Sequence, residues 1–510
     1  MHRSSGVLLH VSSLPGKYGC GDFGRGATEF IDKAAACGFS LWQVLPFCVP
    51  DIYASPYSSM STFSGNPYFI DLEELHRRGL LTTDELAAAE EKSPYACEFE
   101  RLGAERLPLL FRATVRAAQD ADTVAAVDAF MSKNPRVAEF CLFMAKRTAN
   151  GGSAWQEWTN DGFDDCVLFA WRFIQYEFFT EWAKVRAYAN SKGISVIGDI
   201  PFYVALDSSD VWGSRSQFLL DRDGRPEWVA GVPPDYFSAD GQLWGNPLFR
   251  WDEMKKDNYA WWTKRIKAMS ELYDIIRIDH FRGFDSYYAI PAKDKTAKNG
   301  KWKQGPGMDL FNQLEKKLGK LPIIVEDLGF LTDSVRKLLK DSGFPGMKVI
   351  QFAFDSREGS DYLPHTYTSH CVVYTGTHDN DTVMGWMKTA PKASVKFATE
   401  YLNLTEEEGY NWGMMRAAWS SVADMAIVPM QDLIGLGSEA RINIPSTLGE
   451  NWKWRALEGQ ITKDLAKKLY KYMQMYGRIS EKVLAEQAKK AAEKEAAKKK
   501  TSDKKKSSEK

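Results

Sequence analysis

The sequence predicts an α/β fold: a (β/α)8 TIM barrel that carries an inserted, mostly helical subdomain. Three observations lead to this prediction. Eight short apolar runs occur along the chain, and helical patterns alternate with them, as in a parallel sheet covered by helices. The chain has 510 residues, of which 44% are hydrophobic, and this is enough material for a large core. The pattern alone leaves a doubly wound open sheet as the alternative.

Each predicted strand is a run of apolar, often β-branched residues that ends abruptly in polar ones. Runs of this kind are typical of strands buried on both faces, as in a parallel sheet. The eight strands are expected at residues 6–12, 41–46, 194–204, 275–279, 323–327, 347–354, 372–378 and 440–445.

Helical patterns precede six of these strands. A strand, a helix and a second parallel strand form a right-handed crossover unit, and eight strands linked in this way indicate a barrel. The helices are expected at residues 27–36, 168–190, 261–273, 308–318, 334–339 and 410–434.

The spacing of the strands is uneven, and the largest gap separates the second from the third. Residues 94–162 within this gap are rich in Ala, Arg and Glu, so we predict an inserted helical subdomain at about 73–165. A structureless loop of that length would be unusual in a compact domain. The barrel with its insertions is expected to span 1–480.

Residues 481–510 differ from the rest in being rich in Lys and lacking an apolar stripe beyond Leu484. Such a composition cannot bury a core and is typical of a disordered tail. A basic interaction tail is the alternative.

Composition excludes several classes of function. The net charge of −1 gives no basic footprint for nucleic acid. We find no signal segment and no apolar run long enough for a membrane span. The seven cysteines are scattered and show no C-x-x-C spacing, which argues against disulfides and a zinc cluster and favours the cytoplasm. The sequence leaves a monomer and a dimer equally open.

Four acidic residues lie in or just beyond the carboxyl ends of separate predicted strands: Asp199, Asp279, Glu326 and Asp379. Each alone could simply cap the next helix. In a βα-barrel, however, these strand ends converge on the face that carries the active site. Taken together, the four acids therefore indicate a catalytic cluster.

Paired carboxylates in a cleft suit glycosyl transfer, in which one is a proton donor and the other a nucleophile. Arg277 lies two residues from Asp279, so both side chains point to the same face of a strand. We expect this guanidinium to lower the pKa of Asp279, as a nucleophile requires. Glu326 follows Ile-Ile-Val and adjoins Asp327, so its pKa should be raised, as an acid/base residue requires. Asp379 could stabilise the transition state.

A second cluster lies at residues 233–247, where aromatic residues are interleaved with turn formers and amide groups. We interpret it as a loop whose rings stack on sugars and whose polar groups bind hydroxyls. The alternative is a loop held in place by its own aromatic side chains. The polar segment 55–66, with Tyr57 and Asn66, is a further candidate for sugar binding.

These segments together are similar to one known family. The match begins with RSSGVLLHVSSLPGKYGCG at 3–21 and continues in order through 42–46, 55–72, 198–203, 231–247, 277–284, 325–329, 376–382 and 440–455. The chain resembles the amylomaltases, or disproportionating enzymes, which are 4-α-glucanotransferases of glycoside hydrolase family 77. The resemblance implies a (β/α)8 TIM barrel with inserted subdomains and no separate C-terminal β-domain.

The resemblance also implies roles for individual residues. Asp279 matches the nucleophile, Glu326 the general acid/base and Asp379 the transition-state stabiliser. Sugar-contacting positions are implied for Asp199, Arg277, His280 and His378. Residues 231–247 match a lid-like loop on the acceptor side, and its expected contacts are Tyr236, Phe237, Gln242, Trp244 and Asn246. One departure is Ser446, which stands where the family usually has glycine.

The activity implied is transfer of α-1,4-glucan segments from a donor maltodextrin to the 4-hydroxyl of an acceptor glucan or glucose. It would be a retaining double displacement through a covalent glucanyl-aspartate, with maltodextrins or glycogen- and starch-derived glucans as substrates. We see no acidic calcium-type loop and predict no metal or other cofactor. The alternatives are an α-amylase-like hydrolase with water as acceptor and a non-catalytic glycan-binding protein.

Overall fold

The computed structural model describes residues 3–51, 53–234, 239–329, 331–355, 360–485 and 489. Eight parallel strands form the central sheet, in the order β10-β11-β12-β1-β2-β3-β6-β9. Neighbours in the sheet are thus consecutive strands of the chain among these eight, except where β12 pairs with β1. Their bounds are β1 Ser4–Leu8, β2 Leu41–Gln43, β3 Ser195–Ile200, β6 Ile275–Ile278, β9 Ile323–Val325, β10 Gly346–Val349, β11 Cys371–Tyr374 and β12 Met425–Pro429.

The sheet curls into a nearly closed barrel. Val325 N at the end of β9 donates to Pro345 O, just before β10, at 3.1 Å, so the first and last strands of the sheet approach each other. The predicted (β/α)8 TIM barrel is therefore confirmed. No described residue after Pro429 belongs to a strand.

Seven of the eight barrel strands overlap the predicted runs, and the eighth prediction is wrong. The eighth strand is Met425–Pro429, which lies inside the helix expected at 410–434. That region consists of helix α15 (Tyr410–Ser420), strand β12 and helix α16 (Met430–Ile434). The short run MAIVP has helix-forming neighbours on both sides, so its pattern does not stand out from theirs. Residues 441–445 form an irregular segment.

Alternate side chains of the strands fill two separate layers of core. Leu8, Ile197, Ile324, Val372 and Tyr374 belong to a cluster inside the barrel. Their neighbours along the strands, such as Val7 and Val373, belong to the large cluster between the sheet and the helices. This period of two, with both faces buried, explains why the strands are almost continuously apolar.

Helices cover the outside of the barrel. Most of the predicted helices are found within a few residues of the expected bounds. The helices that precede or follow barrel strands are α1 Arg25–Ala36, α7 Asp165–Ser191, α10 Ala260–Leu272, α11 Met308–Leu318, α12 Asp333–Ser342, α15 Tyr410–Ser420 and α17 Lys463–Met475; shorter or more peripheral ones are α8 Ser209–Trp212, α9 Trp251–Lys256, α13 Val383–Thr389 and α14 Lys392–Leu402.

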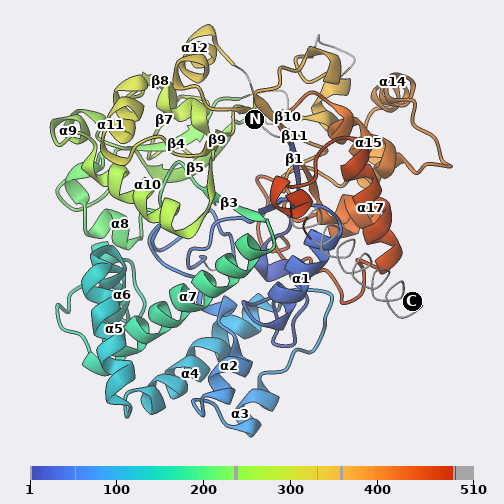
Figure 1. Cartoon of the computed structure of the whole chain (residues 1–510). Helices are drawn as coiled ribbons and strands as arrows, with labels where there is room; N and C mark the ends of the chain where they lie inside the picture. Colours follow the sequence, from blue (N-terminus) through green and yellow to red (C-terminus); the bar gives the residue numbers. More distant parts are fainter. Residues whose placement is uncertain are drawn as a thin grey trace, which may run out of the picture.

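Five further helices lie between β2 and α7. They are α2 Leu72–Arg77, α3 Thr83–Ala88, α4 Phe99–Ala117, α5 Ala121–Lys133 and α6 Pro135–Ala149. Figure 1 shows them gathered at one side of the molecule, with the 27-residue helix α7 between them and the barrel. The boundaries of this insertion as a subdomain stay a prediction.

A second sheet of four antiparallel strands, in the order β5-β4-β7-β8, lies outside the barrel. Its strands are β4 Trp228–Val232, β5 Gln242–Pro247, β7 Ser286–Pro291 and β8 Lys301–Gln304. The expectation of a loop through 233–247 is therefore wrong for residues 242–247, because these residues pair with β4. No helix among the described residues is long and apolar enough to cross a membrane.

Candidate active site

The centre of the site is a buried guanidinium that bridges two carboxylates. Arg277 Nη1 donates to Asp199 Oδ2 at 2.5 Å and to Asp279 Oδ1 at 3.0 Å. The side chains of Arg277 and Asp199 are 3% and 0% exposed, whereas that of Asp279 is 29% exposed. Of these three residues, Asp279 is thus the one that can reach a ligand in the cleft.

The barrel itself sets this geometry. Strands β3 and β6 are parallel neighbours, and Asp199 is paired with Arg277 in their register. The glycine before Asp199 is required by packing, because a Cβ at Gly198 would lie 2.1 Å from the ring of Tyr273. Asp279 follows β6 directly, and its N–H donates to Ile200 O at the end of β3.

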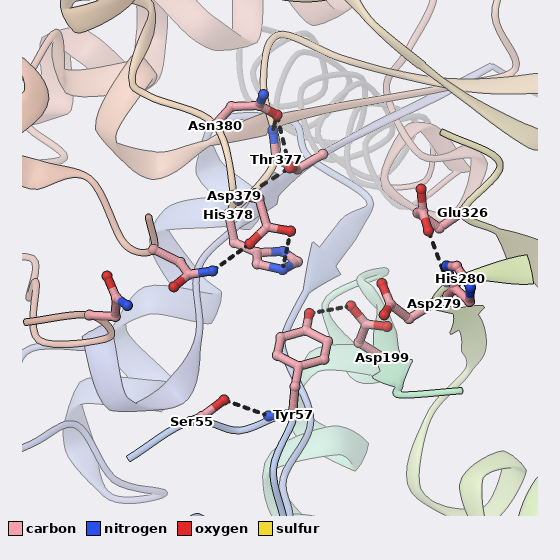
Figure 2. A network of polar contacts seen from close by, with 12 residues as sticks. Ser55, Tyr57, Asp199, Asp279, His280, Glu326, Thr377, His378, Asp379 and Asn380 are labelled. Atoms are coloured by element: carbon pink, nitrogen blue, oxygen red, sulfur yellow. Dashed lines mark hydrogen bonds and ion pairs between the residues drawn. The ribbon is translucent and has the colours of Figure 1, made fainter. Parts of the chain in front are cut away.

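Glu326 follows β9 and is held by two backbone N–H groups. Its Oε2 accepts from His280 N at 2.8 Å, and its Oε1 accepts from Leu328 N at 2.9 Å. His280 follows Asp279 in the chain, so a single peptide unit links the two acids predicted to be catalytic (Figure 2). The structure thus brings the nucleophile candidate and the acid/base candidate together.

His280 adopts an unusual backbone conformation to make this contact. Its φ of 49° and ψ of 50° lie in the left-handed region, which a residue with a side chain enters only at a cost. Strain of this kind is retained when the surrounding structure supports it, and it is common at functional sites. Here it turns the His280 N–H towards Glu326.

Asp379 comes from the loop after β11 and is held by other loops. Asn443 Nδ2 donates to Asp379 Oδ1 at 2.6 Å, and Arg441 Nη2 donates to the Asp379 carbonyl at 2.7 Å. The Asp379 side chain is 46% exposed. Figure 2 shows Asp379 facing the region occupied by Asp279 and Glu326. All three predicted catalytic acids therefore gather at the carboxyl ends of the barrel strands.

Aromatic rings support the site from one side. Tyr57 Oη donates to Asp199 Oδ2 at 2.7 Å, and its ring stacks on His378 with centroids 5.1 Å apart. His378 Nε2 lies 3.4 Å from Asp379 Oδ2. Trp452 packs against both rings, at 5.8 Å from Tyr57 and 6.0 Å from His378. Tyr57 and His378 thus connect the strand-end acids with Asp379.

The segment on the other side carries part of the predicted aromatic cluster. The Trp244 ring meets His280 edge-on at 5.0 Å, and its Nε1 donates to Gln242 Oε1 at 3.0 Å. Asn246 Nδ2 donates to Val204 O. Trp244 is half-exposed and borders the site, whereas the amide of Asn246 is engaged in holding β5. Tyr236 and Phe237 lie outside the described residues.

Asn66 occupies a structural position. Its Oδ1 accepts from Tyr68 N, and it caps the short helix Pro67–Phe69. The residue is buried at 5% exposure. These structural contacts give no support to the prediction that Asn66 contacts a sugar.

Burial raises the pKa of both central acids. The pKa of Asp279 is raised by burial and by the charges of Asp199, Glu326 and Asp379, and Arg277 opposes this. The expectation of a lowered pKa for Asp279 is thus wrong in its net direction: Arg277 acts as predicted, but burial outweighs it. Burial also raises the pKa of Glu326, in the predicted direction. Because the two groups interact, their pKa values describe the titration of the pair and not of either acid alone.

The histidines and Tyr57 have pKa values that fix their protonation. Burial lowers the pKa of His280 to about 4 and also lowers the pKa of His378. Both imidazoles are therefore neutral near pH 7. Burial raises the pKa of Tyr57. Tyr57 therefore keeps its proton and donates a hydrogen bond to Asp199.

Four residues that border the site were not singled out from the sequence. They are Arg441 and Asn443, which hold Asp379; Trp452, which packs on His378; and Tyr203, whose ring lies 6.1 Å from Trp244. All four lie in segments that carried the family resemblance, and this was the available signal. Among the described residues, no cluster of three His, Cys, Asp or Glu side chains could hold a metal ion.

Comparisons with known proteins agree on one family. A family model described as 4-alpha-glucanotransferase matches residues 9–460. A 4-alpha-glucanotransferase from Clostridium butyricum is 46% identical over 489 residues, covering 92% of this chain and all of that protein. The Thermus thermophilus 4-alpha-glucanotransferase is 41% identical, covering 90% of this chain and 96% of that protein.

Solved structures give the same result. The amylomaltase from Streptococcus agalactiae, solved in complex with acarbose, superposes with a TM-score of 0.91 at 35% identity. The match covers 93% of this chain and 99% of that one. The amylomaltase from Corynebacterium glutamicum, at 17% identity and a TM-score of 0.76, shares the fold.

Proposed function

The chain belongs to the 4-alpha-glucanotransferase family and acts on α-1,4-glucans, and from this premise we propose that it works by a retaining double displacement on Asp279, Glu326 and Asp379. The carboxyl ends of the barrel strands hold the three acids around one site. The observation that carries the proposal is the guanidinium of Arg277, bonded to Asp279 beside the buried Asp199.

The first step breaks the donor bond. The Asp279 carboxylate attacks the anomeric carbon, and the electrons of the breaking C–O bond move to the glycosidic oxygen. Glu326 gives its proton to that oxygen, and the fragment with the free reducing end leaves. Burial, which raises the pKa of Glu326, supports its role as the proton donor. Arg277 favours the carboxylate form of both acids, and its direct hydrogen bond is to Asp279, which supports Asp279 as the nucleophile.

The second step forms the new bond. The 4-hydroxyl of an acceptor glucan or glucose attacks the anomeric carbon, Glu326 takes the hydroxyl proton, and the ester bond to Asp279 breaks. One α-1,4 bond is lost and one is formed, so the reaction needs no cofactor or external energy. Asp379, half-exposed and anchored by Asn443, is placed to stabilise the positive charge that develops on the sugar ring.

Transfer competes with hydrolysis at the covalent intermediate, so water must be kept from it. We assign this role to Trp244 and to the rest of segment 231–247, on the acceptor side. Gln242 Oε1 accepts from the indole Nε1 of Trp244 and so orients the ring, which packs edge-on against His280. Tyr57, His280 and His378 are proposed to contact the sugar at the cleaved bond. Asp199 and Arg277, for which a sugar contact was also predicted, are buried and are proposed to act by holding Tyr57 and Asp279.

The chain is expected to function in the cytoplasm on maltodextrins and on glucans derived from glycogen or starch. The described cysteines are all free, and six of the seven are buried, which suits a reducing compartment. Nucleic acid and membranes are not expected partners, in line with the net charge of −1.

Incubation with maltotriose tests the mechanism. The wild-type protein should convert it to glucose and a ladder of longer maltodextrins, which chromatography separates. Asp279→Asn should lower the initial rate by about a thousandfold or more, because the amide cannot form the ester, and circular dichroism should show an intact fold. Substantial transfer by the variant would refute the assigned nucleophile. Glucose and maltose without longer products would identify a hydrolase instead.

A further inference from the structure

A cavity of about 450 Å³ lies on the outside of the barrel, away from the acids. It is open to solvent and is lined by the end of α5, the start of α6, the second half of α7 and helix α10. Its volume is within the range of small-molecule sites, which begins at about 300 Å³. None of the acids, histidines or lid residues described above lines it.

The interior of the cavity is apolar. Val137, Phe179, Trp182, Met269 and Leu272 line it, and Trp182 is almost fully buried. The indole N–H of Trp182 donates to Leu272 O at 2.9 Å, so its polar edge is already satisfied. The wall therefore offers contact to an apolar body and few groups to bind a sugar.

The rim of the cavity is cationic. Five Lys and Arg residues line it against one carboxylate, that of Glu271. Arg136 pairs with Glu139, Arg186 with Asp274 and Lys267 with Glu271. The ammonium groups of Lys133 and Lys264 are both exposed, and within the described part of the chain neither has an ion pair or hydrogen bond. The rim thus carries positive charge that the protein itself does not neutralise.

We propose that this cavity binds an amphipathic organic anion, with its apolar body against Phe179 and Ala183, which keep accessible surface, and its carboxylate, sulfonate or phosphate between Lys133 and Lys264. The two lysines belong to different helices that line the cavity, α5 and α10, and both would attract the anionic group of the ligand. A neutral glucan lacks this charge and has polar faces, so the ligand differs in class from the substrate of the barrel site.

The position of the cavity gives the ligand two fixed walls. Arg186 of α7 donates to Glu271 O and to Tyr273 O, at the end of α10. These bonds, with that of Trp182, join α7 to the end of α10 beside the cavity. Helix α7 precedes β3, and helix α10 precedes β6. A bound anion would therefore contact the helices that lead into both strands.

The experiment uses 8-anilinonaphthalene-1-sulfonate, a fluorescent aromatic sulfonate, as the probe for the full-length protein. We expect saturable binding of one probe per chain. Decanoate should displace it, and decanol, which has the same body without the charge, should displace it at least about tenfold more weakly. Saturating maltotriose should leave the probe bound, because the sugar occupies the barrel site.

Variants test the assignment of the charge and of the volume. The double variant Lys133→Glu/Lys264→Glu should weaken decanoate binding about tenfold or more, and Lys471→Glu, on the distant helix α17, should not. Ala183→Trp should fill the cavity from α7 and abolish binding, whereas Ala393→Trp, on α14, should not. All four variants should keep wild-type transfer from maltotriose, which checks the fold independently of the cavity.

Three results would overturn the proposal. The first is non-saturable probe binding, which would indicate general surface adsorption. The second is displacement of the probe by maltotriose, which would place the probe in the barrel site. The third is unchanged affinity in the double lysine variant or in Ala183→Trp. The proposed catalytic mechanism is tested by transfer itself, so either proposal can fail without the other.

Discussion

The two sides of the active site are built in different ways. On one side, Asp199 and Arg277 belong to adjacent strands and form a buried ion pair, and Asp279 directly follows the second of these strands. On the other side, Asp379 belongs to a loop and depends on Asn443, which is 64 residues away in the sequence. The first side is fixed by the barrel, whereas the second is fixed by side-chain hydrogen bonds between loops. Substitutions should therefore affect the two sides differently, in both activity and stability.

The largest effect is expected on the strand side. Arg277→Met removes the cation that lowers the pKa of Asp279, so that pKa should rise further. Because Asp279 must be ionised to attack, the acidic limb of the pH profile of kcat/KM should move to higher pH, by about one unit or more. The buried Asp199 would also lose its ion-pair partner, so the free energy of unfolding should fall by about 3 kcal/mol or more.

Arg277→Lys is the matched variant, since it keeps the charge but cannot bridge both carboxylates in the same way. Its acidic limb should lie between those of the wild type and Arg277→Met. An acidic limb that stays in place in both variants would show that Arg277 does not control ionisation in the site.

The loop side should respond more weakly. Asn443→Ala removes the donor to Asp379 Oδ1, so kcat should fall about tenfold, as for the loss of a bond to a charged group. Stability should change little because Asp379 is half-exposed and water can replace the donor. Asn299→Ala, which removes a similar bond to Asp294 on the surface, should leave kcat unchanged. An equal fall of kcat in the two variants would contradict the role of Asn443.

Trp244 tests the acceptor side of the site. Trp244→Ala should lower the ratio of transfer to hydrolysis several-fold, because water would reach the covalent intermediate more easily. Trp302→Ala is the control, since Trp302 lies in the same sheet with similar exposure, 43% against 38%. The products from maltotriose measure the ratio. A ratio that is the same in wild type and Trp244→Ala would remove the water-excluding role.

The smallest effect is expected at Ser446, in a loop near Asn443. Its φ is +65°, in the left-handed region where glycine is at ease and serine is strained. Ser446→Gly should therefore stabilise the protein slightly, by about 0.5 kcal/mol. Ser270→Gly, inside helix α10, should instead destabilise it by a similar amount. Thermal unfolding of the two variants measures the difference, and a loss of stability in both would argue against strain at Ser446.

The sequence predicted the strand side of the site better than the loop side. Asp199, Asp279 and Glu326 could be placed because barrel topology brings strand ends together. Asn443 and Trp452 could not, because their contacts depend on loops whose paths no local pattern specifies. The direction of the pKa shift of Asp279 could not be predicted either, because it depends on burial and on charges from three other strand ends.

The fold shows the same contrast. Seven barrel strands were predicted because apolar runs buried on both faces differ clearly from their surroundings. The strand Met425–Pro429 was hidden between helical patterns. The antiparallel sheet was missed because β5 contains Gly and Asn, and β8 is mostly exposed. In these strands backbone pairing, rather than an apolar face, defines the structure.

The two backbone N–H groups that bind Glu326 have a consequence for the direction of catalysis. Burial favours the protonated carboxyl, whereas these hydrogen bonds and Arg277 favour the carboxylate. Burial outweighs these bonds, so the pKa of Glu326 is raised. The same carboxyl gives a proton in one half-reaction and recovers it in the other. Because the bond broken and the bond formed are of the same type, the entropy of mixing governs the spread of chain lengths at equilibrium.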